Sequence, residues 1–504
     1  MTNPLQQAED ANAELLTQRR DRWYPQVHIA ARAGWINDPN GLCHFGDRYH
    51  VFFQHNPAGV VWGPMHWGHV WSRDLVHWNR APIALAPSLP EDQDGVFSGS
   101  AVVTDDGTLA VLYTGHRVAT TAGHDMVEQC QMLATSTDGM TFTKHGVVIE
   151  SRGRADFRDP KVWRQDQQWH MVVAMSSPQR RGQVWHYSSD DLMHWDEGHL
   201  LFEDPDPNVY MVECPDLFRL GDKWVLLYGP MTTARPHGHV GRNGHNCGYV
   251  VGDWNGTQFT PLTDFTPMDW GHNFYAPQTM LAPDGRRLLL GWMGSFAHPL
   301  ACQEDGWCGQ LTVPRELRLD DDLRLHSSPI AEFSQLGRPG KDLGPITVEP
   351  GQPLTLHHGS NPVEVCLGID LAASRAEQIG LRIHDNGSGR RTWVGYDDLS
   401  ERVFVDLSTV SETSGGYRSA RLTRPNNDSR DAATRTADEL CLRVIIDRGS
   451  VEVFADDGRI VLSSFSFPVD SERSVALDTV SGCATLTSVR TRPLAPHWNE
   501  PDRG

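Results

Sequence analysis

Short apolar runs separated by turn residues fill most of the chain. Tyr49–Phe53, His170–Met175 and Leu288–Trp292 are examples, rich in Val and aromatic residues and bounded by Gly, Asp or Asn. This texture is typical of antiparallel strands joined by hairpins. Residues 6–22 instead hold helix formers without Pro or Gly, which predicts one short, mostly solvated helix ahead of the strands. The pattern predicts an all-β fold with a short N-terminal helix.

A weak internal repeat indicates which β architecture to expect. The segment Ser72–Trp78 recurs as Ser189–Trp195, and more loosely at 136–142 and 252–259, so the copies lie about sixty residues apart. In each copy a Ser/Gly-Asp turn is followed by an aromatic residue, which is typical of β-propeller blades. The alternative is four unrelated Asp-containing turns.

The texture changes near residue 313 and again after a Pro-, Gly- and Ser-containing stretch at 327–342. Beyond it, segments such as Val363–Leu371 and Leu440–Asp447 alternate apolar and polar residues, which favours a β-sandwich with a mainly structural role. The predicted domains are a helical extension 1–22, a catalytic propeller 23–325, a linker 326–342, a sandwich 343–490 and a tail 491–504.

Composition narrows the class of protein. The chain has 17 Trp and 46 Gly, which suits a β protein that stacks on sugar rings. A net charge of −20 argues against nucleic-acid or anionic-membrane partners. No secretory signal or membrane-length apolar stretch is recognisable, and the nine Cys show no CxxC pairing, so we expect reduced thiols and a cytoplasmic protein.

Three carboxylates stand near prolines. Asp38 precedes Pro39 in Asp-Pro-Asn-Gly, which we expect to form a stiff turn that aims the side chain, although an ordinary hairpin turn is the alternative. Asp159 lies in Arg-Asp-Pro, and Glu213 lies in Glu-Cys-Pro. Strand ends converge on the channel of a propeller, so these distant acids could meet in one pocket.

Such a pocket fits glycoside cleavage, which needs a nucleophile, an acid/base and a group that holds hydroxyls. A Ca²⁺ or Mg²⁺ site is disfavoured because Arg158 would pair with the adjacent carboxylate. No zinc pattern or phosphate-binding loop occurs in the sequence, and we expect neither a metal nor another cofactor.

Seven motifs together resemble glycoside hydrolase family 32, the β-fructofuranosidases that include invertases and sucrose-6-phosphate hydrolases. They are Trp35–Gly41, Phe97–Ala101, Arg158–Pro160, Glu213–Pro215, Phe274–Gln278, Trp307 with Leu311–Leu317, and Ile446–Phe454. The resemblance extends from Trp23 to about Pro468. It implies a five-bladed β-propeller followed by a β-sandwich.

The resemblance also implies roles. Asp38 would be the nucleophile, Glu213 the general acid and then base, and Asp159 the group that holds fructosyl hydroxyls. The first two carboxyl groups should lie about 5 Å apart, as retaining hydrolysis requires. Hydrogen-bond donors should keep Asp38 ionised, and enclosure should keep Glu213 protonated. Residues expected to line the sugar site are Trp35, Asn37, Gln54, Trp62, Phe97, Ser98, Arg158, Tyr275 and Trp292.

Several alternatives stay open. We expect Cys214 to pack passively, although a thiol beside the acid could also tune it. The substrate could be sucrose, a short fructo-oligosaccharide or sucrose 6-phosphate, and the reaction could be transfer rather than hydrolysis. An inverting pentosan hydrolase and a non-catalytic sugar-binding module are rivals. The basic residues His116, Arg117, His124, Arg152 and Arg154 could reach a phosphate or a longer chain, or could simply be solvated. Oligomeric state is left open.

Overall fold

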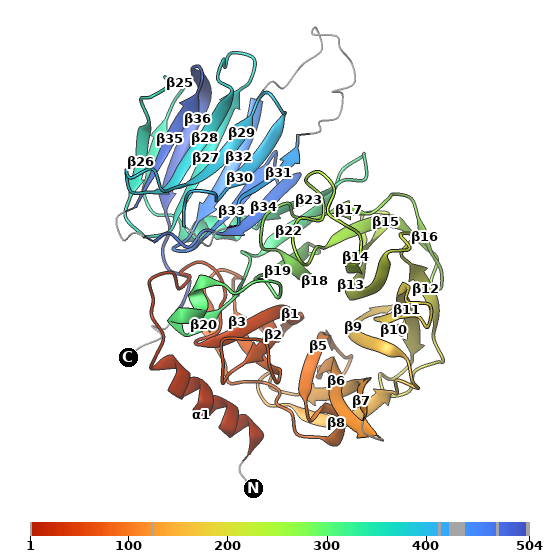
Figure 1. The fold of residues 1–504 in the computed structure, drawn as a ribbon. Helices are drawn as coiled ribbons and strands as arrows, with labels where there is room; N and C mark the ends of the chain where they lie inside the picture. The colour runs from red at the N-terminus through yellow and green to blue at the C-terminus, as the bar shows by residue number, and fades with distance from the viewer. Residues whose placement is uncertain (1–2, 122–123, 412–414, 423–438, 470–472, 500–504) are drawn as a thin grey trace.

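The computed structural model describes residues 3–121, 124–411, 415–422, 439–469 and 473–499. Figure 1 shows one N-terminal helix, a ring of five sheets, and a pair of stacked sheets beside the ring. The prediction of an all-β propeller and sandwich with a leading helix is therefore confirmed.

Helix α1 (Pro4–Leu16) is capped by Asn3, whose Oδ1 accepts a hydrogen bond from the Leu5 N–H (3.0 Å). This N-cap followed by proline is a strong helix start. The predicted end at residue 22 is wrong, because the helix stops at Leu16 and the following arginines turn toward other partners, such as Arg22 to Asp305. No helix in the described part of the chain is long and apolar enough to span a membrane.

The ring consists of five antiparallel blades, with the first strand of each nearest the axis (Figure 1). The first blade holds β1 (Gly34–Phe45), β2 (Arg48–Asn56), β3 (His66–Ser72) and β4 (Trp78–Arg80), and β20 (Trp307–Cys308) joins it in parallel to β1. The second holds β5 (Gly95–Val103), β6 (Leu109–Thr121), β7 (His124–Ser136) and β8 (Thr143–Ile149). The third holds β9 (Ala155–Gln165), β10 (Gln168–Ser176), β11 (Gly182–Ser189) and β12 (His199–Glu203). The pairing of β20 with β1 ties the last part of the ring to the first.

The fourth blade holds β13 (Val209–Leu220), β14 (Lys223–Thr232), β15 (Gly248–Trp254), β16 (Phe259–Pro261) and β17 (Thr266–Pro267). The fifth holds β18 (Tyr275–Leu281), β19 (Arg287–Met293), β21 (Gln310–Leu311), β22 (Arg315–Leu319) and β23 (Leu325–Pro329).

The sequence repeat marks one turn in each blade. Asp74, Asp138, Asp191 and Asn255 each accept hydrogen bonds from backbone N–H groups two and three residues ahead, between the third and fourth strands. Asp320 caps the corresponding turn of the fifth blade, where the sequence repeat had faded. Local Asx-type capping explains why this turn left a signal in the sequence.

The second part is a sandwich of two antiparallel sheets. The strands of one sheet are β24 (Lys341–Leu343), β25 (Ile346–Val348), β27 (Val363–Asp370), β32 (Glu439–Ile446), β33 (Ser450–Ala455), β34 (Ile460–Phe465) and β36 (Ala484–Pro493). Those of the other are β26 (Leu354–His358), β28 (Gln378–Asp385), β29 (Thr392–Asp397), β30 (Arg402–Asp406), β31 (Tyr417–Arg421) and β35 (Ser474–Val480). Alternate residues such as Val365, Leu367, Leu442 and Val444 form the core between them.

The strand bounds differ from the predicted domain boundaries. Strand β23 continues the fifth blade to Pro329, the 3₁₀ helix η3 (Ala331–Leu336) follows, and β24 starts the sandwich at Lys341. Most of the stretch predicted as a linker is therefore built into one part or the other. The Pro and Ser residues of this stretch disfavour a strand prediction from sequence. Its short edge strands are recognised only from their pairing with other strands. The predicted tail also holds structure, because Trp498 pairs with Trp78 of the first blade.

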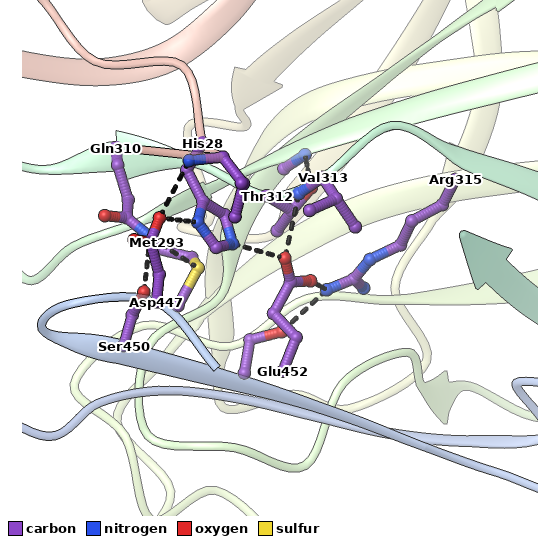
Figure 2. Close-up of polar contacts among 12 residues, drawn as sticks. His28, Met293, Gln310, Thr312, Val313, Arg315, Asp447, Ser450 and Glu452 are labelled. Carbon is purple, nitrogen blue, oxygen red and sulfur yellow. Dashed lines mark hydrogen bonds and ion pairs between the residues drawn. The ribbon is translucent and has the colours of Figure 1, made fainter. Parts of the chain in front are cut away.

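A buried polar cluster joins propeller and sandwich (Figure 2). His28 hydrogen-bonds Asp447 through Nδ1 and Glu452 through Nε2, both at 2.8 Å. Glu452 also pairs with Arg315, which contacts Asp269 at 3.3 Å. All five side chains are fully buried. The motif recognised in the sandwich sequence thus contributes the carboxylates that dock this part onto the propeller.

Candidate active site

The segment Asp38-Pro39-Asn40-Gly41 is part of a strand. It continues β1, whose register against β2 shifts between Ile36 and Pro39 and again between Asn40 and Cys43. The prediction of a turn is therefore wrong. Pairing with β2 and burial of the flanking Trp35 and Ile36 keep the chain extended, and the proline and glycine are accommodated in bulges.

Each innermost strand carries an irregularity at the same level of the channel. The register shifts lie beside Asp38 in β1, Ser98 in β5, Asp159 in β9, Cys214 in β13 and Ala276 in β18. Ser98, Asp159, Cys214 and Ala276 line one narrow cavity together with Pro39, the neighbour of Asp38. β-Bulges re-aim side chains next to active sites, and here they bring residues from five blades together.

Three of the bulged residues have left-handed backbones. Asp159 has φ +65°, Cys214 +49° and Ala276 +46°, and a proline follows each one. A residue before proline normally adopts an extended backbone, so these three positions are strained. Cross-blade hydrogen bonds offset the strain, since the Asp159 N–H donates to Thr114 Oγ1 (3.0 Å) and the Cys214 N–H to Asp159 Oδ2 (2.9 Å).

Asp38 receives donors on both oxygens. Ser98 Oγ donates to Oδ2 (2.6 Å), and Asn37 Nδ2 donates to Oδ1 (3.1 Å). Trp35 Nε1 in turn donates to Asn37 Oδ1 (2.8 Å), which fixes the amide. Burial raises the pKa of Asp38, and the hydrogen bonds from Ser98 and Asn37 offset part of that rise.

Glu213 lies between a guanidinium and a phenol. Arg158 Nη2 donates to Oε1 (2.7 Å), and the Tyr275 hydroxyl donates to Oε2 (2.6 Å). Arg158 also bonds Asp156 through Nη1 (2.8 Å). Burial raises the pKa of Glu213, but the charge of Arg158 and the hydrogen bond from Tyr275 outweigh it, so this pKa lies below its usual value.

The thiol of Cys214 joins the other two acids. Its Sγ lies 3.5 Å from Asp38 Oδ2 and 3.6 Å from Asp159 Oδ2. The expectation that Cys214 packs passively is wrong. Burial raises the pKa of this thiol well above its usual value, so it contacts the acids as a neutral donor. Burial, joined by the charges of Glu213 and Asp38, also raises the pKa of Asp159 to about 7 against the opposing charge of Arg158.

The pKa directions differ from our expectation for the two reacting acids. Asp38 was expected to be the readily ionised group and Glu213 the protonated one, whereas the pKa of Asp38 is raised and that of Glu213 is lowered. The reason is the position of Arg158, whose guanidinium forms an ion pair with Glu213. These pKa directions favour a proton on the other acids rather than on Glu213.

Aromatic side chains pack against one another beside the residues that hold the acids. The ring centroid of Trp292 lies 5.6 Å from that of Trp35 and 4.6 Å from that of Phe296. The ring centroid of His245 lies 5.1 Å from that of Phe296 and 5.1 Å from that of Tyr275. Sequence reasoning missed Phe296 and His245, which lie in loops without a distinctive motif; the charge pattern of the loop around His245 was the available signal.

A second aromatic group comes from the first two blades. Phe97 stacks on His116 (4.1 Å between centroids) and meets the edge of Trp62 (5.9 Å), which is 49% exposed and free to contact a ligand. Gln54 is buried, and its Nε2 donates to the Val96 carbonyl (3.0 Å), so it supports the strand that carries Phe97 and Ser98.

The basic residues considered for a phosphate or longer chain have other roles, except His116. Arg117 pairs with Glu128, Arg152 pairs with Glu197, and Arg154 lies over the rings of Phe157 and Trp185. The side chain of His124 lies outside the described residues. Within the described ranges, no group of three His, Cys, Asp or Glu residues is arranged to hold a metal ion.

Comparison with known proteins identifies this constellation. Residues 28–329 match the glycosyl hydrolases family 32 N-terminal domain, and residues 341–493 match the family 32 C-terminal domain. The chain belongs to glycosyl hydrolase family 32. The family 32 protein is 40% identical over 485 residues to a sucrose-6-phosphate hydrolase of Escherichia coli, covering 96% of this chain and 97% of that protein. It is also 40% identical over 490 residues to an E. coli raffinose invertase, covering 97% and 98%.

Solved structures agree with the assignment. A Bombyx mori family 32 β-fructofuranosidase superimposes with a TM-score of 0.84 at 32% identity, covering 98% of this chain and 99% of that one. A mutant of the same silkworm enzyme has been solved in complex with sucrose, again with a TM-score of 0.84. The family 32 protein described here is thus a glycosidase that acts on fructosides.

Proposed function

We propose that the protein is a retaining β-fructofuranosidase that removes terminal non-reducing fructose from sucrose and short fructo-oligosaccharides. The observation that carries the proposal is the meeting of Asp38, Asp159 and Glu213 from three blades, with the Cys214 thiol within 3.6 Å of the first two. Sucrose is the ligand of the silkworm homologue complex, and invertase is the activity named for an E. coli relative.

Two displacements account for retention. Glu213 protonates the glycosidic oxygen while Asp38 attacks the anomeric carbon of fructose, which gives a covalent fructosyl-enzyme. Water then attacks the same carbon with Glu213 as base, and Asp38 leaves. Asp159 holds fructosyl hydroxyls through the transition state, and Trp62, which is 49% exposed, offers an apolar face to the sugar ring.

The proton must move to Glu213 before the first step. A bound sugar brings hydroxyl donors to Asp38 and Asp159, and hydrogen bonds to a carboxylate favour its ionised form. Displacing water at the same time raises the cost of a charge on Glu213. Both effects favour transfer of the proton from the other acids to Glu213 when the substrate binds.

The rival functions make different demands. An inverting hydrolase needs its carboxyl groups farther apart so that a water molecule fits between nucleophile and sugar. Transfer to a second sugar uses the same intermediate and differs only in the acceptor.

We also propose that the enzyme is intracellular. All nine cysteines are free thiols, which supports this location.

The test measures fructose release by two variants and the anomer of the fructose that the wild type releases first. We expect Asp38→Ala and Glu213→Ala to abolish fructose release from sucrose, with both variants folded by circular dichroism. On a fructoside with a good leaving group, azide should raise the turnover of Glu213→Ala and give β-fructosyl azide, because this substrate needs no acid in the first step and the anion needs no base in the second. NMR should show fructose first released as the β-anomer. Near wild-type turnover in either variant, or first release of the α-anomer, would refute the mechanism.

A further inference from the structure

A cavity of about 740 Å³ lies at the far end of the propeller channel from the sugar site. All five innermost strands line it, each with residues a few positions beyond the one at the level of the acids. These stretches are 42–44 of β1, 101–103 of β5, 161–165 of β9, 217–219 of β13 and 279–281 of β18. A strand rises about 3.3 Å per residue, so the cavity lies roughly 10 Å beyond the acids along the channel.

A buried ion pair separates this cavity from the acids. Lys161 Nζ lies 3.1 Å from Asp216 Oδ2, and the Thr279 N–H donates to the same oxygen (2.7 Å). Lys161 lines both this cavity and the narrow one that Asp159 and Cys214 line. The far cavity is therefore a separate space and not an extension of the sugar site.

Two adjacent arginines at the start of β19 differ in their partners. Arg286 donates to Asp284 Oδ2 (2.7 Å) and to Glu332 Oε2 (3.0 Å). Arg287 lines the cavity, and its buried Nε has no hydrogen-bond acceptor among the described residues. Within the same residues no carboxylate forms an ion pair with its guanidinium, whose carbon lies 4.9 Å from the ring centroid of Phe218. Arg287 thus keeps N–H donors that the protein does not use.

The positive charge of Arg287 is not neutralised by a carboxylate of its own. Burial lowers the pKa of Arg287, and the charge of Asp216 opposes that effect. Asp216, however, is already paired with Lys161, whose pKa is lowered by burial and further by the charge of Arg287. Two cations therefore share one carboxylate. Burying an unpaired charge is costly, and a bound anion would remove that cost.

The other charged groups of the lining do not supply the missing anion. Arg164 pairs with Asp105, whereas Arg219 donates to the Gly221 carbonyl (2.9 Å) and has no carboxylate partner in the described part of the chain. Asp166 is the one carboxylate among the lining residues, and it is exposed. The lining therefore holds more cations than carboxylates in a chain with a net charge of −20, and such a local excess attracts an anion.

Apolar side chains form much of the remaining wall. Trp163, Trp169 and Trp224 line the cavity. Val103 and Leu281 also belong to the lining and are 39% and 60% exposed, so apolar surface is open to a ligand. Sites for small organic molecules typically have a volume of about 300–1,000 Å³ and combine apolar walls with a few charged groups.

We propose that this cavity binds a small organic oxyanion, a carboxylate or phosphate group carried on an organic body, with Arg287 as its principal binding residue. The guanidinium donates charge-assisted hydrogen bonds to the oxygens of the anion, and the organic body lies against the apolar wall. The ligand is bound and not converted, because the three acids lie on the other side of the Lys161–Asp216 pair. The site is independent of the proposed fructosidase activity.

Calorimetric titration of the full-length protein with citrate, 3-phosphoglycerate and inorganic phosphate tests the site. We expect at least one of the two organic anions to bind one-to-one and more tightly than inorganic phosphate. Arg287→Gln should weaken this binding about tenfold or more, as expected for loss of a charge-assisted hydrogen bond. Arg286→Gln is the matched control, because it removes the same charge from the next residue, which already has carboxylate partners, and it should leave the affinity within about twofold.

Leu281→Glu is a second variant at an exposed position of the lining, where a substitution should not disturb folding. Its carboxylate should repel the anion and weaken binding severalfold, and circular dichroism checks that every variant is folded. Absence of binding by both organic anions would overturn the proposal, and so would equal affinities in wild type, Arg287→Gln and Leu281→Glu. Inorganic phosphate that binds as tightly as the organic anions would mean a site for the free ion and would also overturn it. Binding is measured without turnover, so failure of the proposed fructosidase activity would leave this result unaffected.

Discussion

The hydroxyl of Ser98 donates a hydrogen bond of 2.6 Å to Oδ2 of Asp38, although the two residues belong to different blades. Asn37 holds the other oxygen of the same carboxylate. The orientation of Asp38 is thus fixed by its own strand and by the next blade. A nucleophile held in this way loses little orientational freedom when the sugar arrives.

We predict that Ser98→Ala lowers kcat/KM on sucrose by about tenfold to a hundredfold, because a charge-assisted hydrogen bond contributes about 1.5–3 kcal/mol. It should also raise the pKa of Asp38 further, which moves the acidic limb of the pH profile of kcat/KM to higher pH. Steady-state rates from pH 4 to 9 measure both effects.

The control for this variant is Ser100→Ala on the same strand. The Ser100 hydroxyl donates to the Pro160 carbonyl and accepts from the Val162 N–H, both at 2.9 Å, but touches no acid. Its loss should lower thermal stability and leave the acidic limb in place. Equal shifts of that limb in both variants would mean that Ser98 acts only through the packing of blades.

The fold and the three acids were readable from the sequence because their signals are local. The capped turns at Asp74 and Asp191 depend on residues within one segment, and their repetition indicated blades. The conformation around Asp38 was not readable, since a local pattern of Pro, Asn and Gly suggests a turn. Pairing of β1 with β2 decided otherwise, and that pairing is a property of the assembled blade.

The charge pairing within the site could not be predicted from the sequence either. Arg158 was predicted near the acids, but its choice of Glu213 over the adjacent Asp159 depends on where the bulge in β9 points each side chain. The same bulge brings Asp159 to the thiol of Cys214. Side-chain direction at an irregular strand position has no sequence signature of its own, so both pairings needed the structure.

A second prediction concerns the alkaline limb of the pH profile. The acid cluster must keep one proton for the first step, and the pKa of Asp159 near 7 indicates where the free enzyme loses it. We therefore expect kcat/KM on sucrose to fall above an apparent pKa of about 7. Tyr275→Phe removes a donor that stabilises ionised Glu213, so it should move this limb to higher pH.

Tyr228→Phe serves as the control for Tyr275→Phe. Tyr228 donates to Asp204 Oδ2 at 2.7 Å in the same blade as Glu213, in a comparable tyrosine–carboxylate pair away from the three acids. Its removal should leave the alkaline limb unchanged. A limb that moves to lower pH in Tyr275→Phe would contradict the hydrogen-bond direction that the structure assigns.

The final prediction concerns His28 in the cluster between propeller and sandwich. Burial lowers the pKa of His28, but hydrogen bonds to Asp447 and Glu452 outweigh it and raise this pKa from 6.5 to about 9. A raised pKa means that the folded state binds the proton more tightly than the unfolded state. The stabilisation is therefore complete below pH 6.5 and is lost as pH rises through about 9.

We expect His28→Gln to lower the free energy of unfolding by on the order of 3 kcal/mol below pH 6.5, which is the pKa difference expressed as energy. The variant should also lose the wild-type decline in stability between pH 6.5 and 9. Urea unfolding across this range measures both. His50→Gln is the control, because burial lowers the pKa of His50 to about 4 and it carries no charge across that range. It should destabilise the fold at every pH without flattening the alkaline decline, and a flattening there would show that His28 is not the group that titrates.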